Sequence, residues 1–233
     1  MKVKIIKTGS IANCVVVEFS DKKRYILDCG KGTYEIVSQK YKPSDICGFW
    51  TSHDHADHAG DKEKFAQIYE PLKVKDFVNF VEIPVHHGDA ECNALVLLNN
   101  ETKEAFIYAV DFTAYKNELV FLRTMQSLYS GKYKIVYLCE LSHWKGLAKH
   151  LSDKQRQGLD RHLSGEEFIV HIKKVNEVCR CKVITLHASG RQAKVSMAYA
   201  GGSVCNRHYT EKALRRAKIT NVLFGQEGVN YAV

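Results

Sequence analysis

The feature that most constrains the fold is a cluster of histidines and aspartates placed directly after an apolar stretch. Residues 53–58 read His-Asp-His-Ala-Asp-His, so three imidazoles and two carboxylates occupy six positions. They follow the largely apolar residues 46–50, Ile-Cys-Gly-Phe-Trp. Because such a cluster is unfavourable beside a core unless cations neutralise it, it predicts a metal site at the end of a strand.

The spacing within residues 53–58 suits two neighbouring metal ions better than one. Alternate residues of an extended chain point the same way, which puts His53, His55 and Asp57 on one side and His58 elsewhere unless the chain turns. His53 and His55 then hold the first metal, while Asp57 and His58 hold the second, on the turn into a helix starting near Gly60. A single zinc clamp on a helix would want histidines four residues apart. The alternatives are a solvated histidine-rich loop or an accidental single-metal site.

Length and composition predict one domain, residues 1–233, with 45% hydrophobic residues to fill its core. Residues 1–7 alternate charged and apolar side chains as a strand does, and they lack the apolar segment of a signal peptide. No apolar run is long enough to span a bilayer, so we expect a cytoplasmic protein with no membrane partner.

The eight cysteines form no C-x-x-C pair, which favours free thiols.

The net charge of +8, with a pI near 9.0, favours an anionic partner such as nucleic acid or a nucleotide. Basic residues gather twice, at 145–161 and at 207–218. Either cluster lines an anionic substrate or is only a solvated helical face. The sequence leaves the oligomeric state open.

Other apolar runs also end in a histidine or a carboxylate. They are 81–85 before His86-His87, 105–110 before Asp111, and 182–186 before His187. Ligands at the ends of several strands of one sheet can meet at a single rim. The run 135–139 ends likewise in Glu140, and not every such residue need bind metal.

Residues 53–58 resemble the H-x-H-x-D-H hallmark of the metallo-β-lactamase superfamily. The resemblance implies an α/β fold, classed as α+β in some schemes: a four-layer αβ/βα sandwich. Two mixed β-sheets would lie face to face, with helices on the outside and the metals at one rim. Alternating strand and helix patterns on both sides of residues 53–58 agree with this expectation.

The superfamily pattern also assigns the remaining ligands. It implies that His87 completes the three-histidine shell of the first metal, that Asp111 bridges both metals, and that His187 binds the second. His87 is preferred to His86 because it precedes Gly88-Asp89-Ala90, which is similar to the His-Asp-Ala sequence of relatives. The inserted glycine leaves His86 open as the alternative.

Shorter segments resemble the YycJ-like group, bacterial and phage proteins described as exonuclease or phosphodiesterase-type hydrolases. Residues 10–14 are similar to its S-x-x-N-[SC] segment, 26–30 to its L-I-D-x-G segment, and 162–164 to its H-L-S element. The resemblance implies that Asp28 hydrogen-bonds backbone and ligand loops. An ordinary turn aspartate is the alternative.

Residues 164–178 are predicted to form a helix on physical grounds. Ser164 and Glu167 match a capping box. One apolar stripe follows the helix: Phe168, Ile172, Val175 and Cys179. We expect His171 to lie off this stripe and exposed. His162, just before the cap, is either a substrate contact near the site or a surface histidine.

These residues predict a dinuclear metal-dependent hydrolase. Two cations about 3.5–4 Å apart share a water whose pKa falls toward neutrality, so that a metal-bridging hydroxide attacks without a covalent enzyme intermediate. The expected catalytic residues are Asp57, Asp111 and His162. Two zinc ions are expected from the imidazole-rich ligands, with manganese as the alternative.

Three functions compete. Phosphodiester hydrolysis, by a nuclease or a cyclic-nucleotide phosphodiesterase, is favoured by the basic charge and by the group resembled. Hydrolysis of a carbon ester, thioester or lactone is the enzymatic alternative, supported slightly by Ala59-Gly60. A non-catalytic binding module is the third, and the complete ligand set disfavours it.

Overall fold

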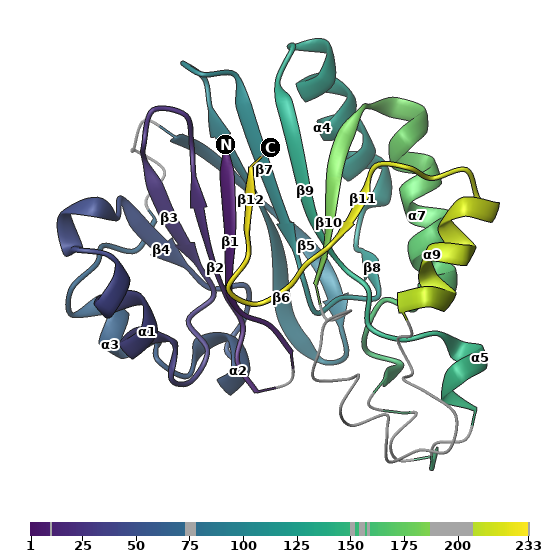
Figure 1. Ribbon diagram of the computed structural model, residues 1–233, viewed down its shortest axis with the longest axis horizontal. Helices are drawn as coiled ribbons and strands as arrows, with labels where there is room; N and C mark the ends of the chain where they lie inside the picture. The colour runs from purple at the N-terminus through teal and green to yellow at the C-terminus, as the bar shows by residue number, and fades with distance from the viewer. Residues whose placement is uncertain are drawn as a thin grey trace.

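The computed structural model shows two β-sheets that face each other, with helices on both outer sides (Figure 1). The structure describes residues 1–9, 11–72, 78–149, 152–153, 157, 159–186 and 207–232. The strands are β1 (Lys2–Lys7), β2 (Cys14–Glu18), β3 (Arg24–Leu27), β4 (Gly48–Trp50), β5 (Val78–His87), β6 (Ala90–Asn99), β7 (Glu104–Ala109), β8 (Ala114–Tyr115), β9 (Lys134–Glu140), β10 (Cys181–Leu186), β11 (Val222–Phe224) and β12 (Asn230–Ala232). The helices are α1 (Thr33–Lys40), the short 3-10 helix η1 (Pro43–Asp45), α2 (Ala56–Ala59), α3 (Lys62–Ala66), α4 (Glu118–Ser130), α5 (Lys145–Ala148), α7 (Gly165–Val178) and α9 (Arg207–Arg216).

Both sheets are mixed. The first has the order β12-β1-β2-β3-β4, in which β3 and β4 are parallel and the other neighbours antiparallel. The second has the order β11-β10-β9-β7-β6-β5-β8, in which β7, β9, β10 and β11 are mutually parallel. The chain passes from the first sheet to the second after α3. The loop after β4 contacts the second sheet, because the Asn93 amide of β6 donates to the Ser52 carbonyl at 3.1 Å.

Three apolar layers hold the four structural layers together. Strand residues such as Val17, Leu27 and Leu138 fill the space between the sheets. Phe65 of α3 packs on the outer face of the first sheet, and Phe168 of α7 on the outer face of the second. Strands buried on both faces read as nearly continuous apolar runs, as β7 does. The expected four-layer αβ/βα sandwich with two mixed sheets is confirmed.

The predicted helix at 164–178 is confirmed as α7, with Ser164 as its N-cap and the capping box with Glu167 formed. The expected exposure of His171 is wrong, because this side chain is buried with 6% of its surface exposed. His171 lies three residues after Phe168, within the wide apolar face that a core-facing helix buries. The imidazole remains compatible with the core because its Nε2 lies 2.9 Å from the Tyr137 hydroxyl.

The helix expected near Gly60 begins earlier than predicted. The short helix α2 starts at Ala56, with His55 as its N-cap in extended conformation. Asp57 and His58 therefore lie within its first turn rather than on the approach to it. This turn brings His58 back toward His53, which an extended chain would not do.

Two broader expectations concern thiols and membranes. All seven cysteines among the described residues are free, and all but Cys47 are buried. Within the described ranges, we find no helix with the length and apolar character needed to cross a membrane. A cytoplasmic location stays a prediction.

Candidate metal centre

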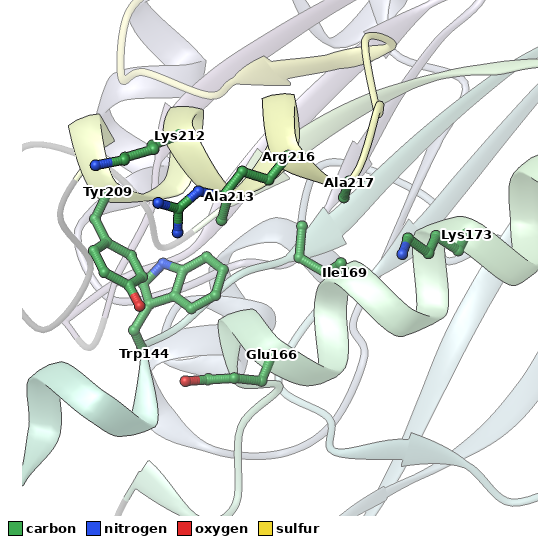
Figure 2. A pocket seen from close by; sticks show the side chains of 9 residues that line it. All are labelled: Trp144, Glu166, Ile169, Lys173, Tyr209, Lys212, Ala213, Arg216 and Ala217. Carbon is green, nitrogen blue, oxygen red and sulfur yellow. The ribbon is translucent and has the colours of Figure 1, made fainter.

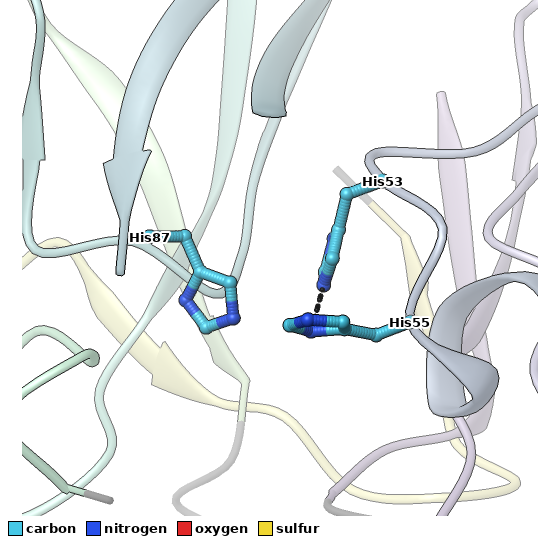
Figure 3. A group of neighbouring side chains, drawn as sticks. All are labelled: His53, His55 and His87. Atoms are coloured by element: carbon cyan, nitrogen blue, oxygen red, sulfur yellow. Dashed lines mark hydrogen bonds between the residues drawn. The ribbon is translucent and has the colours of Figure 1, made fainter. Parts of the chain in front are cut away.

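A cluster of histidines and carboxylates lies at the rim where strands of both sheets end. His53 and His55 come from the loop after β4 of the first sheet, and His58 from α2. His87 ends β5 of the second sheet, and Asp111 follows β7 by two residues. Figure 3 shows that His53 and His55 approach from one side and His87 from the other, with their rings directed toward one another. Segments distant in sequence thus supply one site.

The donor atoms form three overlapping groups, within each of which the atoms lie no more than 4.8 Å apart. The groups are His53, His55 and His87; His53, His58 and Asp111; and His87, Asp111 and His162. Asp111 Oδ2 lies 3.0 Å from His58 Nε2, 3.8 Å from His87 Nε2 and 4.0 Å from His53 Nε2. Asp111 belongs to two groups, so it occupies the middle of the cluster.

Backbone contacts from Asn13 and from the loop at residues 28–30 hold α2 in position. The Cys29 amide donates to the His58 carbonyl at 2.6 Å, and the Asn13 amide donates to the Asp57 carbonyl at 2.6 Å. Gly30 packs so closely here that a Cβ would lie 2.2 Å from the Asp57 carbonyl oxygen. Only glycine therefore fits at this position, and the approach places the first turn of α2 against the site.

Asp28 organises the cluster from beneath. Its fully buried carboxylate accepts hydrogen bonds from the Ser52 amide at 2.7 Å and from the Tyr108 hydroxyl at 2.7 Å, and it lies 2.6 Å from His58 Nδ1. These are the contacts with backbone and ligand loop that the family resemblance implies. By holding Nδ1, Asp28 directs His58 Nε2 toward Asp111.

Two of the aspartates in the cluster have left-handed backbone conformations within two residues of a strand end. Asp28 has a φ of 59° after β3, and Asp111 has a φ of 49° after β7. Aspartate tolerates this region better than most residues, although the conformation remains strained. Such strain is often retained at functional sites, where it aims a side chain that an extended strand would carry past the rim.

His162 and Glu140 form a hydrogen-bonded pair at the edge of the cluster. His162 Nδ1 lies 2.7 Å from Glu140 Oε1 and 3.7 Å from Asp111 Oδ1. The fully buried Glu140 also accepts the Phe112 amide through Oε2 at 2.9 Å, which fixes the carboxylate. The His162 side chain is 23% exposed, so the pair connects the buried cluster to solvent.

The surroundings separate the imidazoles electrostatically. Burial lowers the pKa of His53 to about 4 and also lowers the pKa of His87. Burial opposes the charged form of His58 too, but the Asp28 and Asp111 carboxylates outweigh it and raise the pKa of His58 well above its ordinary value. His53 and His87 are thus in the neutral form that binds metals, and the two carboxylates favour a cation at His58.

Comparisons with known proteins agree with this geometry. Residues 8–76 match the family model described as "Metallo-beta-lactamase superfamily". The structure resembles YhfI from Bacillus subtilis with a TM-score of 0.62 and 11% identity, covering 99% of both chains. The fold is that of the metallo-beta-lactamase superfamily. Members of this superfamily are mostly metal-dependent hydrolases.

Two further solved structures resemble this chain in fold. The short form of human tRNase Z has a TM-score of 0.62 and 11% identity, covering 100% of this chain and 99% of its own. Zn²⁺-bound PqqB from Methylobacterium extorquens has a TM-score of 0.54 and 8% identity, with 100% of both chains covered. No curated protein sequence matches the chain.

The donor set fits a divalent metal. Two nitrogens bound tetrahedrally to zinc at about 2.0–2.1 Å lie roughly 3.4 Å apart, which falls within the spacing of these groups. His53 Nε2 and His55 Nδ1 lie at the hydrogen-bonding distance of 2.9 Å, so these two nitrogens are already close to that spacing. Neutral imidazoles beside buried carboxylates are the expected ligands of such an ion.

Most residues predicted from the sequence meet in this cluster. The structure brings together six of them: His53, His55, His58, His87, Asp111 and His162. Asp57 lies at the border, with Oδ2 3.4 Å from His58 Nε2, and His187 lies outside the described residues. His86 is exposed, whereas His87 is 3% exposed and faces the cluster.

Sequence reasoning missed two supporting residues. Glu140 was recognised only as one more strand end, although it ends β9, which runs parallel to β7 and therefore ends at the same rim as Asp111. The side-chain nitrogen Nδ2 of Asn13 lies 2.9 Å from His58 Nε2 and 3.4 Å from Asp57 Oδ2. The signal for Asn13 was the segment at residues 10–14, which carries no ligand of its own.

Proposed function

We propose that the protein is a dinuclear metal-dependent phosphodiesterase that acts on nucleic acid or a nucleotide, with two zinc ions as the preferred metals. The observation that carries this proposal is the Glu140–His162 pair beside the donor cluster. A metal centre alone suits many hydrolyses. Cleavage of a phosphodiester releases an alkoxide, as does cleavage of a carbon ester, and this alkoxide needs a proton donor at the rim. The pair meets that need, and the Arg161 side chain at the same rim favours the phosphodiester.

The residues divide into three tasks. His53, His55 and His87 would hold one ion, and Asp57, His58 and His187 the other, with Asp111 shared between them. When bound, the ions would supply an activated water and polarise the substrate oxygen. Asp28 orients His58 from behind through Nδ1, and the Asn13 side chain lies beside Nε2 on the face toward Asp111. The Glu140 carboxylate holds His162 where its imidazole can protonate the leaving oxygen.

A cation beside the site favours a phosphodiester over a neutral ester or lactone. The exposed Arg161 lies next to His87, since its carbonyl oxygen is 3.1 Å from His87 Nδ1. Its side chain lies over Gly88, where a Cβ would be 3.2 Å from Arg161 Cδ. A charged guanidinium at this rim attracts a phosphoryl group and gives a neutral substrate little benefit.

Two further considerations support the proposal. The net charge of +8 attracts polyanions to the whole surface. A structure named tRNase Z is among those that this chain resembles, which supports a nucleic-acid substrate. Within the superfamily we favour the YycJ-like branch, because residues 10–14 and 162–164 supply Asn13 and His162 to the site.

The test combines metal analysis by mass spectrometry with parallel assays of bis-p-nitrophenyl phosphate, single-stranded RNA, single-stranded DNA, cyclic mononucleotides and a lactone. We expect two metals per chain and hydrolysis of a phosphodiester. The variant Arg161→Gln should raise KM for the phosphodiester, while Arg180→Gln, an exposed arginine before β10, should not. Clear hydrolysis of the lactone with none of the phosphodiesters would refute the proposal.

A further inference from the structure

A pocket of about 430 Å³ lies between α7 and α9 and shares no residue with the metal centre (Figure 2). Two aromatic side chains and three basic ones line it, together with one carboxylate. They are Trp144, Tyr209, Lys173, Lys212, Arg216 and Glu166. Because neither the metal ligands nor the Glu140–His162 pair reaches this pocket, the proposed hydrolysis leaves it unexplained.

The two aromatic rings have different roles. Trp144 is 4% exposed, donates from Nε1 to the Thr210 hydroxyl at 2.7 Å, and packs so closely on Gly165 that a Cβ there would lie 2.3 Å from the indole. Tyr209 is 44% exposed, and its ring centroid lies 5.0 Å from that of Trp144 at 67°. Trp144 therefore fixes the base of the pocket, and Tyr209 presents an accessible ring above it.

The charge of the pocket is not neutralised locally. Lys173, Lys212 and Arg216 are exposed, and within the described part of the chain none of the three forms an ion pair. On the same helix, Arg207 and Arg215 both pair with Glu211. Counting only partners in the described ranges, the cations of α9 without a carboxylate partner are therefore those that line the pocket.

The pocket is also joined to the catalytic rim by two adjacent segments. The Ser142 amide donates to the Leu163 carbonyl, and His143 forms a parallel bridge with Ser164. These segments begin at Glu140 and His162 and end at Trp144 and Gly165. Four extended residues span at most roughly 14 Å. A polymeric ligand that is bound across the metal centre can therefore also reach the pocket.

We propose that this pocket binds one nucleotide of a single-stranded nucleic acid whose neighbouring linkage lies at the metal centre. Its base would stack on Tyr209, and its phosphates would contact Lys212 and Arg216. Single strands are favoured because an unpaired base can leave its stack to reach a side chain. An acidic peptide would pair with the cations, but its carboxylates would not stack on the exposed Tyr209 ring. The proposal rests on the proposed function and specifies its substrate.

Binding is tested on the full chain carrying His53→Ala, so that the strand is not cut, with fluorescence anisotropy of a labelled single-stranded oligoribonucleotide. Tyr209→Ala should weaken binding roughly ten-fold, and Tyr209→Phe should restore it. An abasic strand of the same length should be insensitive to Tyr209→Ala. Arg216→Ala should lower the slope of log affinity against log salt by about one. The matched control is Arg215→Ala, which removes the same charge from the same helix outside the pocket.

The outcomes separate this proposal from the proposed function. Equal losses of RNA affinity in Arg215→Ala and Arg216→Ala, or unchanged RNA binding in Tyr209→Ala, would overturn the proposed nucleotide binding in the pocket. This conclusion would hold even if bis-p-nitrophenyl phosphate is hydrolysed. Equal competition by polyglutamate would overturn it in favour of an acidic partner. Absence of any phosphodiester hydrolysis would refute the function, while ring-dependent RNA binding would still support the pocket. In the active protein, Tyr209→Ala should raise KM for RNA and leave bis-p-nitrophenyl phosphate unaffected.

Discussion

His53 and His171 are equally buried, but His53 lies in the cluster of metal-ligand side chains and His171 lies in an aromatic cluster of the core. His53 is 5% exposed and His171 is 6% exposed, and burial lowers the pKa of each to about 4. His53 faces the imidazoles of His55 and His58 and the Asp111 carboxylate. His171 sits among the rings of an aromatic cluster: Phe112, Tyr115, Phe121 and Tyr137.

The comparison shows that burial and a lowered pKa do not by themselves identify a site. His171 Nε2 has its hydrogen bond with Tyr137, whose hydroxyl also lies 2.9 Å from the Tyr115 hydroxyl. His171 Nδ1 lies 3.9 Å from Glu118 Oε1, so both ring nitrogens face a partner within the fold. Around His53, by contrast, ligand-type atoms from separate segments face one another. Convergence of donors distinguishes the two regions, and this difference predicts that one controls activity and the other stability.

The largest effect is expected from the ligands. His53→Ala or Asp111→Asn should abolish turnover of bis-p-nitrophenyl phosphate and reduce the bound metal, because both side chains belong to two donor groups. The circular dichroism spectrum should be retained, since the core lies beneath the rim. His86→Ala is the matched control on the exposed face of β5. Wild-type turnover in His53→Ala would contradict the assignment.

The next effect concerns proton transfer. His162→Gln should lower the rate of RNA cleavage by roughly 10²- to 10⁴-fold, the usual contribution of a general acid. Bis-p-nitrophenyl phosphate should be affected much less, because p-nitrophenolate leaves without a proton. Glu140→Gln should lower RNA cleavage less than His162→Gln, since the amide retains the hydrogen-bonding geometry. Equal losses on both substrates would argue that His162 binds metal or substrate instead.

His171 should control stability in acid. Burial lowers the pKa of His171 from 6.5 to about 4. Between pH 6.5 and about pH 4, the imidazole is protonated in the unfolded chain but not in the folded chain. The free energy of unfolding therefore decreases as the pH falls through this range, by up to about 3 kcal/mol.

The measurement compares urea unfolding of the wild type and His171→Leu at neutral pH and midway between the two pKa values. His171→Leu should lose less stability on acidification, and its activity at neutral pH should equal that of the wild type. An identical pH dependence in the two proteins would show that His171 is not the titrating group. Loss of activity would remove the distinction between the two regions.

The sequence predicted which donor residues lie together better than it predicted the residues that support them. Residues 53–58 stand out because histidine and aspartate next to an apolar run need a cation, and strand ends explain why His87 and Asp111 join them. The burial of His171 was missed because the apolar stripe includes Ile172, four residues after Phe168, but not His171, three residues after it. Both positions lie on the same helix face as Phe168. Pairing of Glu140 with His162 depends on the path of residues 141–161, which no local pattern encodes.

The smallest effect should distinguish the two regions through a pair of tyrosines. Tyr108 donates its hydroxyl to Asp28 at 2.7 Å, and Tyr115 lies at hydrogen-bonding distance from Tyr137 within the aromatic cluster. Both hydroxyls are buried, so Tyr108→Phe and Tyr115→Phe should each lower the free energy of unfolding by about 1 kcal/mol. Only Tyr108→Phe should also weaken metal binding, by roughly ten-fold, because Asp28 orients His58. Competition with a fluorescent chelator measures the affinity, and equal metal affinities in the two variants would show that the Asp28 network supports the fold alone.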